Sequence, residues 1–219
     1  MTLLEFARGP AINAALVIFV FGVIWRLFWL LFLPRAADHS VAKLGAGAAV
    51  SSAAGGFVRH MWPPREYAAR TRFSLIVGYV LHFGLAIIVF GFAQHILFIR
   101  DIFGIGWPGL PTGVITVVSV ITLAALIAAL VRRMTNPVLK MISTFADYWA
   151  WFVVTLPVVT GLMAVSHLLL RYEDMLGVHI LSVALMLATF PFSKLMHAFL
   201  VFVTRSQTSF FYSRRGSHV

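Results

Sequence analysis

The sequence of 219 residues contains no cysteine. A chain without cysteine cannot form disulfides, thiolate zinc sites or iron–sulfur clusters of its own, and it cannot attach a c-type haem covalently. Any redox centre that this chain holds must therefore be bound through histidine or methionine. The sequence has 8 of each.

Charged residues are also scarce, at 11% of the chain, and 7 acidic residues stand against 17 lysines and arginines. Hydrophobic residues make up 61%, and the mean hydropathy is +0.94. This balance excludes an ordinary soluble domain and predicts an all-α integral membrane protein. We attribute the net charge of +10 to basic loops that fix the orientation in the membrane, and we do not expect a nucleic-acid partner.

Five stretches are long and apolar enough to cross a bilayer, which needs about 20 residues per helix. They cover approximately residues 11–33, 73–98, 113–131, 148–170 and 178–203. The first is longer than the apolar region of a signal peptide and lacks a small-residue cleavage site, so we expect it to stay in the mature protein. The sequence thus predicts a single five-helix membrane domain spanning residues 1–219.

Lysine and arginine alternate between the connecting segments. The 34–72 loop, the connection between the third and fourth stretches, and the tail carry most of them, whereas the opposite segments hold Arg8, Arg100 and Arg171. Because basic loops stay on the cytoplasmic side, we expect the N-terminus outside and the C-terminus in the cytoplasm. The 34–72 loop is then cytoplasmic.

Two of the apolar stretches each carry a pair of histidines. His179 and His197 lie eighteen residues apart, which is five whole turns of one helix, so both imidazoles would share a face about 27 Å apart along the axis. The second stretch carries His82 and His95. In the expected orientation His82 matches the depth of His197, and His95 that of His179. These matched depths predict two b haems, each held between two imidazoles of facing helices.

The second stretch presents a geometrical difficulty. His82 and His95 are thirteen residues apart, or about 220° around an ideal helix, so they would not share a face. Either this helix is distorted, for which its three glycines give an opportunity, or the outer ligand is another residue. His167, near the outer end of the fourth stretch, is the alternative candidate.

The segment Phe190 to His197, with the sequence FPFSKLMH, closely resembles the last helix of the gamma subunit of respiratory nitrate reductase. That family consists of five-helix dihaem membrane cytochromes b. Further similarity covers Arg133 to Gly161 and the run His82-Phe83-Gly84.

The resemblance implies that His82 and His197 ligate an inner haem and that His179 supplies one side of an outer haem. It also implies that quinol is oxidised near the outer haem and that electrons pass inward to an iron–sulfur subunit. In that family the second ligand of helix two comes ten residues after the first, where this chain has Phe92. His95 would have to take its place.

The 34–72 loop sets the chain apart from nitrate reductase. Similar proteins serve as membrane cytochromes of heterodisulfide-reductase-like or sulfur-metabolising complexes, and this chain fits that group as well. The loop's Ala/Gly/Ser-rich part, residues 46–56, is typical of a flexible connector. The alternative is a docking surface for the cytoplasmic iron–sulfur partner, formed by Trp62, Tyr67 and the surrounding arginines.

Basic and polar residues at the two ends of the helices give further candidates. Arg26, Arg72 and Lys194 lie toward the expected cytoplasmic side, where each would either reach the lipid headgroups or pair with a haem propionate. Toward the outer side, Gln94, Arg100 and His167 are candidates for a quinone site, which needs an apolar slot and hydrogen-bond partners for the carbonyls.

These observations predict a membrane cytochrome b subunit of a bacterial or archaeal cytoplasmic membrane. It would carry electrons between the quinone pool and a cytoplasmic iron–sulfur partner through two b haems, with quinol dehydrogenase activity near the outer face. Two alternatives stay open. One is a monohaem cytochrome with the His82 and His197 site alone, and the other is a non-redox membrane anchor or transporter subunit whose histidines bind nothing.

Overall fold

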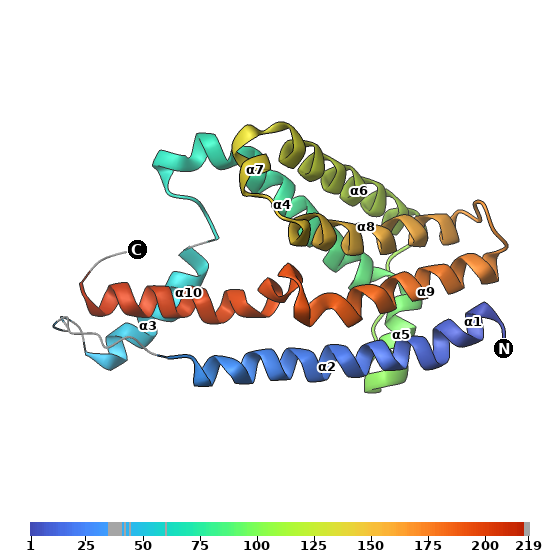
Figure 1. The fold of residues 1–219 in the computed structure, drawn as a ribbon, viewed down its shortest axis with the longest axis horizontal. Helices are drawn as coiled ribbons and strands as arrows, with labels where there is room; N and C mark the ends of the chain where they lie inside the picture. The colour runs from blue at the N-terminus through green and yellow to red at the C-terminus, as the bar shows by residue number, and fades with distance from the viewer. Residues whose placement is uncertain (35–40, 42, 44, 60, 217–219) are drawn as a thin grey trace. The chain divides into compact units, whose positions relative to one another are not determined.

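The computed structural model describes residues 1–34, 41, 43, 45–59 and 61–216, and every regular element within them is a helix (Figure 1). Five helical stretches are long and apolar enough to cross a membrane: Leu3–Phe32, Arg65–Gly91, Thr112–Thr135, Phe145–Val165 and Tyr172–Phe192. The prediction of an all-helical, multi-pass membrane protein with five candidate spans is confirmed.

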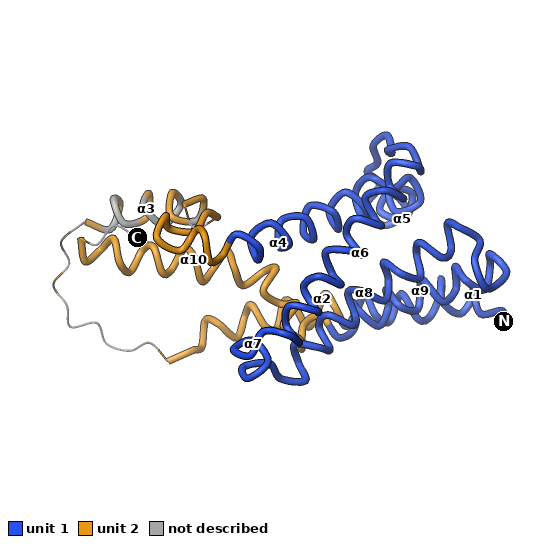
Figure 2. The backbone as a smooth tube through the Cα atoms, turned by 90° about the horizontal axis from the view of Figure 1, so that it is seen from above, with its two compact units in different colours: residues 1–18, 72–189 blue, residues 19–71, 190–219 orange. Residues whose placement is uncertain are grey.

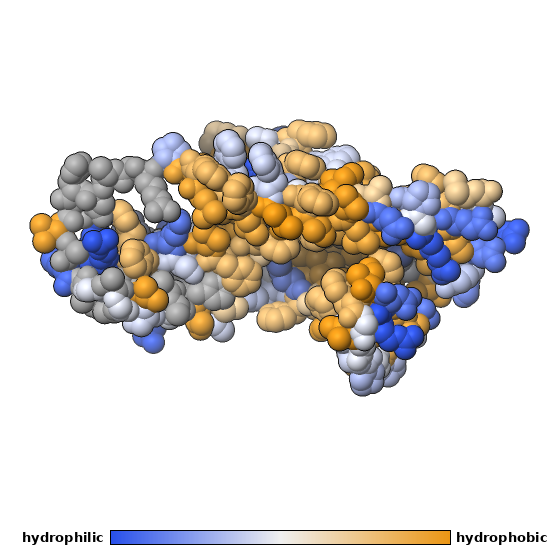
Figure 3. Space-filling model, turned by 90° about the horizontal axis from the view of Figure 1, so that it is seen from below, coloured by the Kyte–Doolittle hydropathy of each residue, from blue (hydrophilic) through white to orange (hydrophobic). Residues whose placement is uncertain are grey.

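The long helices expose many large apolar side chains. Phe21 is 70% exposed, Phe83 61% and Val117 59%, and Figure 3 shows apolar residues in orange over much of one face. Such a surface would be unfavourable in water but suits contact with lipid tails. The exposed side chains therefore agree with the hydropathy of the sequence.

The chain divides into two compact units, coloured separately in Figure 2. Unit 1 contains Met1–Ile18 and Arg72–Thr189, and unit 2 contains Phe19–Thr71 and the residues from Phe190 onward. One boundary falls inside helix α2 (Ile12–Trp29). Another falls directly after helix α9 (Tyr172–Thr189).

Unit 1 is built around α9 and the helices that pack on it. The remaining helices of this unit are α1 (Leu3–Phe6), the π-helical turn η1 (Ala7–Ala11), α4 (Arg65–Gly91, in this unit from Arg72), α5 (Ala93–Phe103), α6 (Thr112–Thr135), α7 (Pro137–Ile142) and α8 (Phe145–Val165). Helix α8 packs against both α9 and α6, and α1 with η1 packs against α9. Ile12, Ala15 and Ala184 form a small core where the start of α2 meets α9.

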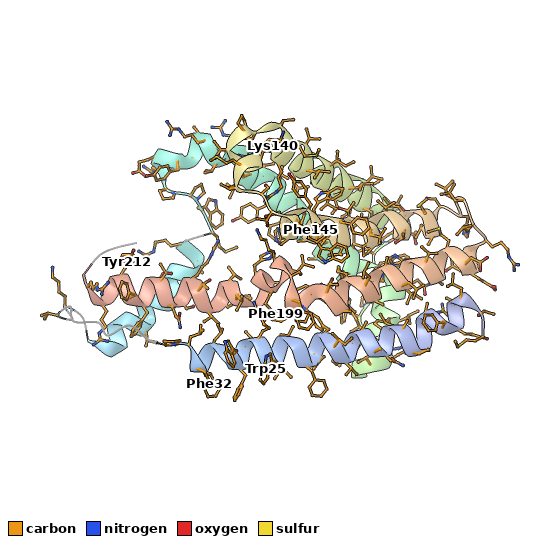
Figure 4. All side chains as sticks on the ribbon, viewed as in Figure 1. Trp25, Phe32, Lys140, Phe145, Phe199 and Tyr212 are labelled. Atoms are coloured by element: carbon orange, nitrogen blue, oxygen red, sulfur yellow. The ribbon has the colours of Figure 1, made fainter. Side chains whose placement is uncertain are left out.

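Polar contacts also hold the helices of unit 1 together. Trp151 of α8 donates from Nε1 to the carbonyl of Leu126 on α6 at 2.8 Å. At the beginning of α8, Asp147 accepts from the backbone and hydroxyl of Thr144 at 3.0 Å each. Asp147 also forms an ion pair of 3.0 Å with Arg133 of α6. These contacts hold the start of α8 against the end of α6, near Lys140 and Phe145 (Figure 4).

Unit 2 pairs α3 (Ala46–Arg59) with α10 (His197–Arg214). The contact is close because both helices present small residues: a side chain at Gly56 would collide with Ser209. The second half of α2, the short turns η2 (Leu30–Phe32), η3 (Phe190–Phe192) and η4 (Lys194–Met196), and the first residues of α4 complete this unit. Phe19, Phe190 and Phe199 form an aromatic cluster, while Trp25 and Phe32 project outward (Figure 4).

The prediction of one continuous helix over residues 178–203 is wrong. Helix α9 ends at Thr189, α10 begins at His197, and Ser193 between them is extended, with φ −112° and ψ 178°. Pro191 lacks an N–H group and cannot continue the hydrogen-bond ladder of the helix. His179 and His197 are therefore not joined by five uninterrupted turns of one helix, and the spacing no longer places their imidazoles on the same helix face.

The interpretation of the 34–72 segment as a loop is also wrong for most of its length. Residues Ala46–Arg59 form α3, and α4 already begins at Arg65. Alanine is the strongest helix former, and the small side chains of α3 allow close packing on α10. Residues 35–40, 42, 44 and 60 of this segment lie outside the described residues.

Candidate functional site

His95 of α5 and His179 of α9 lie side by side in unit 1. Their ring centroids are 6.2 Å apart, and the ring planes differ by 21°. Both residues are half-buried. From the sequence, His95 and His167 were the alternatives for the position beside His179, and in the structure His95 lies there.

A break in the predicted second helix places His95 beside His179. Helix α4 ends at Gly91, Phe92 is extended with φ −79° and ψ 125°, and α5 starts at Ala93. Because of the break, Nδ1 of His95 reaches the carbonyl of Ile88, seven residues earlier, at 2.9 Å. Seven residues of continuous helix would span about 10 Å, so this bond requires the distortion. Of the two alternatives for the stretch over residues 73–98, the structure thus shows the distorted helix.

The segment after α5 binds the carbonyl groups that the break releases. Trp107 donates from Nε1 to the carbonyl of Phe90 at 2.7 Å. The backbone N–H of Leu110 donates to the carbonyl of Gly91 at 2.8 Å. Backbone groups at membrane depth need internal partners, since lipid offers none. Residues 107–110 thus stabilise the bend on which the position of His95 depends.

His179 is held by polar residues of α8 and α9. Its Nδ1 lies 3.1 Å from Oγ1 of Thr160. Ser182 lies 3.0 Å from the same hydroxyl and donates to the carbonyl of His179 at 2.6 Å. Gly161, next to Thr160, leaves room for the imidazole between the two helices. Both the ring and the backbone of His179 are therefore fixed.

These hydrogen bonds determine which ring nitrogen carries a lone pair. A neutral imidazole has one donor and one acceptor nitrogen, and a carbonyl oxygen can only accept. Nδ1 of His95 therefore donates to Ile88, which leaves the lone pair on Nε2. The hydroxyl of Thr160 is engaged with the carbonyl of Leu156 at 2.8 Å, so it accepts from Nδ1 of His179. Metal-bound histidines usually have this arrangement.

The separation of the two rings is of the size expected if both imidazoles bound one iron. With metal–nitrogen bonds of about 2 Å, two Nε2-bound imidazoles have their centroids roughly 6 Å apart. The observed separation is 6.2 Å. Among the described residues no three or more His, Asp or Glu side chains gather as a metal site, but a bis-histidine haem takes only two ligands from the protein. His95 and His179 thus suit a haem.

The other two candidate ligands lie in different units. His82 belongs to α4 in unit 1 and donates from Nδ1 to the carbonyl of Gly78 at 2.7 Å. His197, the first residue of α10 in unit 2, makes the same kind of bond to the carbonyl of Lys194 at 2.8 Å. In each ring Nδ1 is thus the donor nitrogen. That His82 and His197 share a haem stays a prediction.

The opposite face of α5 lines an open cavity of about 480 Å³. Its walls come from one face of α5 and from the following segment: Ala93, Ile96, Leu97, Arg100, Gly106, Trp107, Pro108 and Gly109. Of the residues predicted for a quinone site, Arg100 lies here, whereas Gln94 is exposed on α5. His167 lies in a turn with φ 54°, its ring 5.2 Å from that of Tyr172.

The three basic residues predicted near haem propionates are exposed. Arg26 lies in the last turn of α2, Arg72 in α4 and Lys194 in η4. Their roles stay predictions. Thr160 and Trp107 were not predicted from the sequence. Each had a signal there, namely a hydroxyl within an apolar helix and a tryptophan beside the turn residues Pro108 and Gly109.

The chain is similar to a protein of Nitratidesulfovibrio vulgaris (strain Hildenborough) over almost its whole length. The two are 29% identical over 218 residues, which cover 96% of this chain and 94% of the other. That relative is named simply "Protein", which indicates no activity. No family model matches the chain, and no solved structure matches it. The function must be inferred from the site itself.

Proposed function

We propose that this protein is the membrane cytochrome b subunit of a respiratory redox complex. It transfers electrons between quinone and a cytoplasmic iron–sulfur partner. The observation that carries this proposal is the His95 and His179 pair, whose rings lie 6.2 Å apart with Nδ1 of both hydrogen-bonded. Such an arrangement supports iron ligation, because metal-binding histidines usually have the other ring nitrogen hydrogen-bonded in this way.

The residues of the chain have separate tasks in this proposal. His95 and His179 would hold the iron of a b haem, which supplies a one-electron carrier when bound. Ile88 and Thr160 fix the two ring orientations through Nδ1. The bend at Phe92 brings the first ring toward the second.

The cavity beside α5 is the proposed quinone site. Its walls are largely apolar, and Arg100 offers hydrogen-bond donors for a quinone carbonyl. Helix α5 carries His95 on one face and lines the cavity with the other. Quinol bound there would give its two electrons, one at a time, to the haem that His95 and His179 would hold, and its two protons to the adjacent solution. In the expected orientation the N-terminus lies outside, so these protons would enter the solution on the outer side of the membrane.

The resemblance to the nitrate reductase gamma subunit extends the proposal to a second haem between His82 and His197. Arg26, Arg72 and Lys194 are the candidates for its propionates. The iron–sulfur partner would dock on the cytoplasmic 34–72 segment, which contains α3. The cytoplasmic membrane of a bacterium or archaeon is the expected location.

A reduced-minus-oxidised spectrum with a pyridine haemochrome assay on the purified full chain tests the proposal. We expect two b haems per chain, with His179→Ala and His197→Ala each removing one. His167→Ala is the matched control and should retain both. One haem that is lost with His179→Ala but kept in His197→Ala would reduce the proposal to a monohaem cytochrome at the pair seen in the structure. A chain without haem would overturn the proposal and favour a membrane anchor or transporter subunit.

A further inference from the structure

We propose that Thr160 is a positioning residue for His179 that lowers the reduction potential of the iron this histidine ligates. The inference rests on the proposed function, because it presupposes a haem at the His95 and His179 pair. Thr160 itself would touch neither the iron nor the quinone. It would act through the hydrogen bond to Nδ1 of His179.

Thr160 contacts the ring of His179, which also has a backbone hydrogen bond to Pro157 on the same helix as Thr160. Thr160 is 5% exposed, and its hydroxyl lies 2.8 Å from the carbonyl of Leu156 and 3.3 Å from that of Pro157. With its proton directed to these carbonyls, the oxygen keeps a lone pair for Nδ1 of His179 at 3.1 Å. The hydroxyl thus fixes the tautomer in which Nε2 is the ligating nitrogen.

Ser182 of α9 also restrains His179. Its hydroxyl lies 3.0 Å from that of Thr160 and donates to the carbonyl of His179 at 2.6 Å. The two hydroxyl groups therefore lie in contact, one bonded to the ring of His179 and the other to its backbone. A change at Thr160 affects the ring, whereas a change at Ser182 affects mainly the backbone contact.

The direction of the effect follows from ligand basicity. When Nδ1–H donates a hydrogen bond, the imidazole becomes a stronger electron donor at Nε2 and stabilises ferric more than ferrous iron. Loss of the bond should therefore raise the potential. If ferric binding is weakened about tenfold relative to ferrous binding, the one-electron potential rises by about 59 mV.

The chain offers a matched control on the same helix. Thr155 is 8% exposed and bonds from its hydroxyl to the carbonyl of Trp151 at 2.8 Å, the same kind of bond that Thr160 makes to Leu156. Thr155→Val removes a hydroxyl of the same chemistry from α8 without removing a bond to His179. Thr160→Ser keeps the hydroxyl and should restore the wild-type potential.

The experiment is a spectroscopic redox titration of the full chain in detergent, with the haem on His179 identified by its loss in His179→Ala. We expect a raised potential in Thr160→Val, an intermediate one in Thr160→Cys because a thiol accepts weakly, and wild-type values in Thr160→Ser and Thr155→Val. Equal potentials in Thr160→Val and Thr155→Val would overturn the inference.

If Thr160→Val does not fold, the reduction potentials of Thr160→Cys and Thr160→Ser are compared instead. Equal potentials in these two variants would overturn the inference. If Thr160→Val folds with the melting temperature of Thr155→Val but loses the haem, the ligand has lost its orientation and the inference is supported. Absence of haem from the wild-type chain would overturn the proposed function and this inference with it. Unchanged potentials in a haem-containing chain would overturn the inference alone.

Discussion

Gly161 of α8 faces the imidazole of His179 so closely that a Cβ atom at this position would lie 3.0 Å from Cε1 of the ring. Ordinary van der Waals contacts between carbon atoms are about 3.5–4.0 Å. The ring of His179 therefore fills space that any larger residue on α8 would need. Thr160, its neighbour in the sequence, holds the same ring by a hydrogen bond.

Gly161→Ala should displace this imidazole by a few tenths of an ångström while leaving the five spans intact. We expect a shifted spectrum or reduced occupancy of the haem on His179, because axial ligation tolerates little misplacement. Haem content and the reduced absorption bands are the measurement. Gly113→Ala in α6 is the control, since nothing lies within 4 Å of its added Cβ. Identical spectra for the two variants would contradict a ligand role for His179.

Trp107→Phe should destabilise the bend between α4 and α5. The substitution keeps an aromatic ring but removes the N–H group that donates to the carbonyl of Phe90. An unsatisfied carbonyl in apolar surroundings costs about 1–3 kcal/mol. We expect a lower melting temperature in detergent and a lower affinity for the haem proposed at His95. Trp25→Phe, at a residue 60% exposed, is the comparison, and an equal effect there would count against the stabilising role of residues 107–110.

Arg100→Gln should weaken quinol binding in the cavity beside α5. A hydrogen bond to a charged group contributes about 1.5–3 kcal/mol, so loss of the guanidinium should raise the KM for a quinol analogue about tenfold or more. The measurement is haem reduction by the analogue at increasing concentrations. Arg171→Gln provides the control, because its side chain is 83% exposed. An unchanged KM in Arg100→Gln would remove this cavity as the quinone site.

Asp147→Asn should lower the stability of unit 1 without changing the haem on His179. It weakens the 3.0 Å ion pair with Arg133 and the capping bonds to Thr144 at the start of α8. Loss of such a cap costs about 1 kcal/mol. Thermal unfolding followed by circular dichroism measures this loss. Glu173→Gln is expected to have less effect, because its carboxylate is 70% exposed and lies 4.0 Å from Arg171. A larger effect of Glu173→Gln would contradict this account.

Breaks in the helices could not be located from the sequence. Hydropathy adds contributions residue by residue, so it detects a span but not a bend within it. The bend at Phe92 depends on donors from Trp107 and Leu110, which lie fifteen or more residues further along the chain. In the last span, hydropathy did not show that the α-helix ends at Thr189 and begins again at His197. Residues 46–56 looked like a flexible connector because their composition does not reveal that α10 packs on them.

The sequence by itself determined the all-helical membrane class, the five candidate spans and the restriction of any redox centre to histidine or methionine. These conclusions follow from composition, which needs no knowledge of contacts. The tertiary structure decided which imidazole lies beside His179. Spacing along an ideal helix argued against His95, but the bend after Gly91 turns this residue to a ring separation of 6.2 Å. The physical reason is that the direction of a side chain depends on the whole hydrogen-bonded backbone before it, and at this bend the partners come from distant residues.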